Sequence, residues 1–163
     1  MDMVPCYQIC KDVNCSHFDI ECFECDRLLD DCEHATAHLV SDRENQKLDE
    51  NWHGRRVLTF SDGRPSGEGY YICGRREGRF RYWYESGGLM ESGYFVNDER
   101  GGKWRFWYSD GRLKNEGFYV EGKRHGFWRF WYKNGQLRSE GNYEESVKVG
   151  RWSYWYEDGQ LMY

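Results

Sequence analysis

The sequence predicts a mainly β protein: an elongated, single-layer antiparallel sheet of stacked β-hairpin repeats, preceded by a small cysteine-rich segment that is partly helical. Glycine returns every 24 residues through the second two-thirds of the chain, and short aromatic runs lie between these glycines. In addition, 19 Gly but only 2 Pro indicate many tight turns without a proline-rich linker. Aromatic residues make up 18% of the chain, and because each buries a large apolar area, they are expected to build the core.

Charge and composition divide the chain near residue 54. Residues 1–53 carry 4 Lys/Arg against 13 Asp/Glu, a net charge of −9, whereas residues 54–163 carry 19 against 15, a net charge of +4. Six of the seven cysteines precede residue 33, and seven of the eight tryptophans follow residue 54. We therefore expect an acidic N-terminal segment, 1–53, followed by a separate repeat array, 54–163.

The N-terminal segment has more than one interpretation. Cysteines and apolar residues between 22 and 39 recur at steps of three and four, which predicts an amphipathic helix over about 19–48. Zinc binding and disulfides are the alternatives, and the possible zinc ligands are Cys22, Cys25, Cys32, His34 and His38, or Cys6, Cys10, Cys15 and His17. A continuous helix would hold Cys25 and Cys32 roughly 10 Å apart, too far to share one zinc ion. We favour the helix, and we predict no metal and no cofactor.

The repeat array divides into five hairpin units. Residues 54–77 form a degenerate N-terminal cap, 78–101, 102–125 and 126–149 are full units, and 150–163 is a shortened one. In each full unit an aromatic strand such as Trp104–Tyr108 leads into a pair such as Asp110-Gly111, which favours a two-residue type I′ turn.

The position of this turn predicts which residues lie opposite each other. The expected pairs are Tyr108–Leu113, Phe106–Asn115, Trp104–Gly117, Arg105–Glu116 and Arg129–Glu140. On one side of the hairpin large rings then face small residues, and on the other side each Arg meets a Glu. A slip of one residue would destroy both patterns, which supports this register. The empty position at Gly117 is expected to leave room for Trp104.

The motif Tyr119-Val-Glu-Gly-Lys-Arg-His-Gly126 resembles the tyrosine- and glycine-rich signature of MORN repeats. Gly126–Gly135 followed by Gln136-Leu137 is similar to their aromatic-rich 24-residue variant, which also occurs in bacterial proteins regarded as antitoxins. The resemblance covers about residues 54–163 and implies an elongated sheet used as a scaffold, for dimerisation, or for docking partners and sometimes acidic lipid. The cysteine-rich leader also resembles proteins of large cytoplasmic DNA viruses.

One surface of the array is the candidate binding site. Basic and aromatic residues recur on one side of the predicted sheet and in the last unit: Arg81, Trp83, Arg105, Trp107, Arg129, Trp131, Trp152 and Trp155. The alternative is a self-contained ladder, in which these arginines pair with glutamates of the array and stack on its tryptophans.

No sequence motif points to catalysis. The chain lacks a Walker loop, a G-x-S-x-G elbow, an H-E-x-x-H motif and a dinucleotide fingerprint, so we predict no enzyme. The expected function is a repeat scaffold for protein–protein interaction or assembly, including a structural role in a virus particle. The alternative is an antitoxin-like or acidic-lipid-associated protein that uses the basic aromatic face.

The same features set expectations for partners and location. A pI of about 5.6 argues against nucleic acid, and no apolar stretch approaches the roughly 18 residues of a membrane span. Residues 1–10 do not resemble a secretory signal, which favours the cytoplasm, or a virus particle. The shortened last unit keeps its rings, so we expect a protein partner, possibly a second copy, to cover it.

Overall fold

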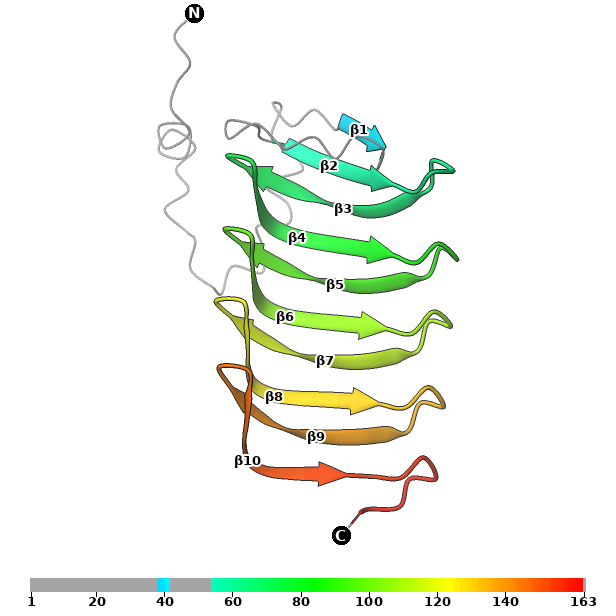
Figure 1. Cartoon of the computed structure of the whole chain (residues 1–163), viewed down its shortest axis with the longest axis vertical. Helices are drawn as coiled ribbons and strands as arrows, with labels where there is room; N and C mark the ends of the chain where they lie inside the picture. Colours follow the sequence, from blue (N-terminus) through cyan, green and yellow to red (C-terminus); the bar gives the residue numbers. More distant parts are fainter. Residues whose placement is uncertain (1–37, 42–53, 163) are drawn as a thin grey trace, which may run out of the picture.

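The computed structural model describes residues 38–41 and 54–162, which form one open ten-stranded sheet (Figure 1). The strands are β1 (His38–Ser41), β2 (Gly54–Thr59), β3 (Pro65–Ile72), β4 (Arg75–Trp83), β5 (Leu89–Val96), β6 (Glu99–Trp107), β7 (Leu113–Val120), β8 (Lys123–Trp131), β9 (Leu137–Glu144) and β10 (Val147–Tyr154). Each strand pairs with its neighbours in the sequence, and β2–β10 are antiparallel throughout. The predicted sheet of stacked hairpins is confirmed.

The first strand corrects part of the helix prediction. Residues 38–41, within the helix expected over 19–48, form β1, which pairs in parallel with β2 from His38 opposite Arg56 to Ser41 opposite Thr59. The free edge of β2 offers backbone hydrogen bonds to this short segment, and its β-branched Val40 suits a strand. The remainder of the predicted helix lies outside the described residues.

The register away from the hairpin loops is as predicted. Trp104 lies opposite Gly117, Phe106 opposite Asn115, Arg105 opposite Glu116, and Arg129 opposite Glu140. The prediction for the residues next to the loop was wrong, because Trp107 rather than Tyr108 lies opposite Leu113.

The cause is the length of the loop. The backbone nitrogen of Gly111 donates to the oxygen of Tyr108 (2.9 Å), and that of Tyr108 donates to the oxygen of Arg112 (2.8 Å), so three residues form the loop. Gly111 has a φ of 86°, whereas Asp110 has no positive φ, which excludes the predicted type I′ turn. A turn closed by a left-handed glycine is a common three-residue hairpin loop, and it shifts the adjacent register by one residue.

Type I′ geometry is instead found at the opposite ends of the strands, in the turns that connect one hairpin to the next. There Val120 lies opposite Lys123, and both intervening residues have positive φ, 48° at Glu121 and 73° at Gly122. The corresponding pair Asn97 and Asp98 has the same left-handed conformation. These two-residue turns connect successive hairpins.

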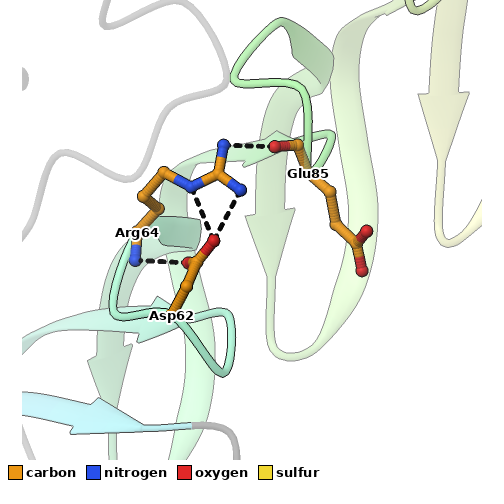
Figure 2. A network of polar contacts seen from close by, with 3 residues as sticks. All are labelled: Asp62, Arg64 and Glu85. Atoms are coloured by element: carbon orange, nitrogen blue, oxygen red, sulfur yellow. Dashed lines mark hydrogen bonds and ion pairs between the residues drawn. The ribbon is translucent and has the colours of Figure 1, made fainter.

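The two kinds of loop lie at opposite ends of the strands, along the two long sides of the array (Figure 1). Figure 2 shows how the three-residue loops are braced. The carboxylate of Asp62 accepts from the backbone nitrogen (3.0 Å) and Nε (2.7 Å) of Arg64, whose guanidinium donates on to the carbonyl of Glu85 in the next hairpin. The Arg64 side chain is the largest cause of a lowered pKa at Asp62. Arg112 repeats the arrangement by donating to the Lys133 oxygen at 2.8 Å.

The core is a row of rings along one face of the sheet, which we call the front face. The buried rings are Tyr71, Phe80, Phe95, Trp104, Tyr119, Trp128, Phe130 and Tyr143, and Tyr82, Phe106 and Trp152 pack against them. Neighbouring rings meet edge to face, with centroids 5.1 Å apart for both Phe95–Trp104 and Tyr119–Trp128. The expectation that aromatic residues build the core is confirmed.

The glycines opposite these rings make room for a different ring from the one predicted. A Cβ at Gly117 would lie 2.2 Å from Trp128, and a Cβ at Gly93 would lie 2.2 Å from Trp104. Each indole therefore covers the glycine of the preceding hairpin, not the glycine opposite it in its own hairpin. The expected pairing of Gly117 with the Trp104 ring was wrong, because the ring leans toward the preceding strand.

Candidate functional site

The predicted arginines lie on the side of the sheet opposite the ring row, which we call the back face. Arg81, Arg105 and Arg129 each directly follow or precede a front-face ring, and successive strand residues point to opposite faces. Their ion pairs are Arg81–Glu68 (3.1 Å), Arg105–Glu116 (3.2 Å) and Arg129–Glu140 (3.3 Å). The predicted ladder of cross-strand pairs is confirmed.

These pairs balance the charge of the back face. Lys103 also contacts the Glu116 carboxylate, at 3.1 Å. Burial raises the pKa of Glu116, but Lys103 and Arg105 lower it more, so that the net pKa lies below the ordinary value. The guanidinium of Arg129 lies 5.4 Å from the ring centre of Phe127, rather than over a tryptophan as the self-contained ladder predicted.

The tryptophans of the predicted site have two placements. Trp83, Trp107, Trp131 and Trp155 are half-buried, and all but Trp83 accept a tyrosine hydroxyl of the preceding hairpin at their carbonyl oxygen. For example, Tyr108 donates to Trp131 at 2.8 Å. Trp152 belongs to the front-face ring row, 5.0 Å from Tyr143. The structure therefore separates Trp152 from the other predicted residues.

The back face also has exposed apolar side chains, which the sequence analysis did not single out. Their exposed fractions are Tyr94 37%, Val96 53%, Phe118 50%, Val120 52% and Phe127 44%. Phe118 and Phe127 line a shallow hollow together with Lys103 and Arg129. Alternation along β5, β7 and β8 predicts these exposed positions, because their neighbours Phe95, Tyr119 and Trp128 are buried front-face rings.

The front face carries a second group of cations that the sequence analysis missed. A cation recurs every 24 residues and lies over a ring: Arg76 lies 3.9 Å from the centre of Phe95, Arg100 4.4 Å from Trp104, Arg124 4.8 Å from Trp128, and Lys148 4.3 Å from Trp152. Cation–ring contacts of this kind contribute about 0.5–2 kcal/mol. The 24-residue spacing of these four cations is visible in the sequence and could have identified them as a recurring group.

The four cations differ in their acidic partners. Arg76 pairs with Asp98 (2.9 Å), and Arg100 pairs with Glu91 (2.7 Å). For Arg124 and Lys148, no carboxylate of the described residues lies within ion-pair distance. Positive charge on the front face is therefore compensated toward β4 and uncompensated toward β10.

The candidate metal ligands lie almost entirely outside the described part of the chain. Only His38 falls within it, in β1, and the cysteines and histidines of both possible zinc sets otherwise precede it. In the described ranges, no three His, Cys, Asp or Glu side chains gather as a metal site.

Comparison with known protein families matches four stretches of the chain to the MORN repeat variant: residues 76–97, 100–121, 124–145 and 148–163. Together they cover about half of the chain and follow the 24-residue period. The chain belongs to the MORN repeat family. Each matched stretch begins at one of the front-face cations, and the first three stretches end one residue beyond a hairpin's second strand.

Membership of this family bears on function only in general terms. MORN repeats commonly bind proteins or membrane lipids, and the family is generally a non-enzymatic scaffold. No match supports a viral origin, and no curated protein is similar enough to the chain to serve as a relative. Nowhere in residues 38–41 and 54–162 is there a helix that could span a bilayer.

Proposed function

We propose that this MORN array is a non-enzymatic scaffold that binds a partner protein across its back face. The observation that carries the proposal is the exposed apolar patch formed by Tyr94, Val96, Phe118, Val120 and Phe127. Large apolar side chains next to one another on a surface favour a partner that covers them.

The surroundings of the patch fit a protein interface. Lys103, Arg105 and Arg129 pair with glutamates beside the patch, and the half-buried Trp107 and Trp131 share the same face. An apolar centre rich in aromatic residues, with a charged rim, is the usual anatomy of such interfaces. Because the cations of the rim already pair with glutamates of the array, a partner does not have to be a polyanion to bind this face.

The antitoxin-like or lipid-associated alternative gains less support on this face. Arg81, Arg105 and Arg129, on which it rested, are each neutralised by a glutamate at 3.1–3.3 Å. Acidic lipid would have to compete with these pairs for every arginine.

The test is capture of partners by the full chain with Phe118→Ser and Phe127→Ser combined. We expect the bound protein to be lost, because both substitutions remove exposed apolar contact area without disturbing the buried rings. Tyr156→Ser, which changes a similarly exposed aromatic residue outside the strands, in the loop after β10, is the matched control and should retain binding. Equal capture by the parent chain and the double variant would contradict the proposal.

A further inference from the structure

The front face has a hollow over the C-terminal units that the proposed back-face function does not use. It is open, with a volume of about 380 Å³, and Asn115, Phe130, Ser139 and Tyr143 form part of its lining. Four cations also line it: Lys114, Arg124, Arg138 and Lys148.

None of these four cations forms an ion pair with another described residue, in contrast to the paired arginines of the back face. Their contacts are with rings and hydroxyls. Arg124 lies over Trp128 and donates to the Tyr143 hydroxyl at 3.4 Å, and Lys148 donates to the Tyr154 hydroxyl at 3.2 Å. Four like charges around one hollow repel each other unless an anion is bound.

Comparison of successive units explains where the compensating charge was lost. In one unit Glu91 binds Arg100 through both carboxylate oxygens, at 2.9 and 2.7 Å. The residues 24 and 48 positions further on are Asn115 and Ser139, which are neutral. The later units therefore keep the cation, as Arg124 and Lys148, but have a neutral residue in place of the glutamate that would pair with it. This leaves the C-terminal hollow positively charged.

A second observation distinguishes between anions. The Oδ1 atom of Asn115, which belongs to the lining, is buried and has no hydrogen-bond partner among the described residues. This oxygen needs a donor, and a peptide supplies one through its backbone N–H. A phosphate or carboxylate ion alone offers chiefly acceptors. The hollow thus suits an acidic peptide, which brings both carboxylates and N–H groups.

We propose that the acidic N-terminal segment of this same chain, residues 1–37, docks in the front-face hollow. This segment contains nine Asp/Glu and two Lys/Arg, a net charge of −7, opposite in sign to the lining. Because it is covalently attached, its effective concentration at the array is in the millimolar range, so weak ion pairs suffice.

The length of the segment permits this contact. It joins the sheet at His38 in β1, and seven strand spacings of about 4.8 Å place β8 roughly 34 Å away. Asp19, Glu21 and Glu24 precede His38 by 14 to 19 residues, which span at most about 46–68 Å. These carboxylates therefore reach the hollow, whereas Glu33, five residues before His38, does not.

The experiment is zero-length carbodiimide cross-linking of the full chain, followed by peptide mass spectrometry. The reagent joins a carboxylate to an amine only where the two are in contact, and Lys114 and Lys148 provide amines in the hollow. We expect both to join residues 1–37, and 1 M NaCl to suppress these links because it reduces the screening length to about 3 Å. Lys133, an exposed lysine in a hairpin loop, is the internal reference.

Two charge-neutralising variants distinguish an effect of the charges in the hollow from an effect of the chain's net charge. Arg138→Gln should reduce the Lys114 and Lys148 links by about two- to fivefold, because one of the four cationic contacts is lost. Arg151→Gln removes the same charge from the back face of β10 and should leave them unchanged. Both arginines are exposed, so neither change leaves a cavity among the buried rings.

Three results would overturn the proposal. The first is that Lys114 and Lys148 join residues 1–37 no more often than Lys133 does. The second is that links form between isotopically labelled and unlabelled copies, which would assign the segment to another molecule. The third is that vesicles containing phosphatidylserine bind the full chain through Arg138 while the links within the chain do not form.

Discussion

Gly117 packs directly against the Trp128 ring, as Gly93 does against Trp104, and Gly117→Ala tests this contact. A Cβ at this position would lie 2.2 Å from Cδ2 of the indole and 2.3 Å from Cε2. An ordinary carbon–carbon contact is about 3.6 Å, so the ring would have to withdraw by roughly 1.4 Å.

The ring has no room for that movement. Trp128 is 0% exposed, its Nε1 donates to the Phe118 oxygen at 3.1 Å, and Tyr119 meets it edge to face at 5.1 Å. Withdrawal would break the hydrogen bond, at a cost of about 1 kcal/mol, and loosen ring contacts that contribute about 0.5–1.5 kcal/mol each. We therefore expect Gly117→Ala to lower the free energy of unfolding by about 3 kcal/mol.

The assay is urea unfolding followed by tryptophan fluorescence, with Gly88→Ala as the control. Gly88 has no positive φ, and a Cβ there would lie no closer than 3.5 Å to another group, so its replacement should change stability by less than about 0.5 kcal/mol. If Gly117→Ala unfolds at the same urea concentration as the parent chain, the packing argument is wrong.

Three further substitutions test other parts of the structure. Tyr108→Phe removes the hydroxyl that donates to the Trp131 carbonyl and should cost about 1 kcal/mol in urea unfolding; no change would show that the bond contributes nothing. Glu116→Gln should cost up to about 1 kcal/mol at pH 7, and this difference should disappear as pH falls below the ordinary value of 4.5 through the lowered pKa, because a carboxylate with a depressed folded-state pKa stabilises only while ionised; a difference that is independent of pH would refute this. Glu121→Asn should stabilise by about 0.5–1 kcal/mol, since φ at this turn position is 48° and Asn tolerates it better; a lower melting temperature would contradict the turn assignment.

The sequence predicted the parts of the fold that a two-residue alternation determines. Trp104 must face the core and Arg105 must not, so their partners Gly117 and Glu116 followed directly. The loop conformation did not follow, because Asp-Gly suits both a two-residue and a three-residue loop. The structure decides between them through the left-handed Gly111.

The candidate site was only partly predictable. Alternation placed Arg129 and Glu140 on one face, and their ion pair was foreseen. The position of Arg124 over Trp128 was not, because residues four apart in a flat strand are about 13 Å from each other. The left-handed Gly126, with a φ of 66°, bends β8 between them, and the guanidinium comes within 4.8 Å of the ring centre.

The differences between units carry more functional information than their similarities. The 24-residue period specifies rings, glycines and turns alike in every unit, and these account for stability and shape. Glu91, Asn115 and Ser139 occupy one slot of that period, yet only the first neutralises its cation. Nothing in the packing of the rings requires this change, because Arg124 stacks on its ring as Arg100 does. Its consequence is electrostatic: among the described residues, it leaves the cations of this slot without an acidic partner in the C-terminal half of the front face.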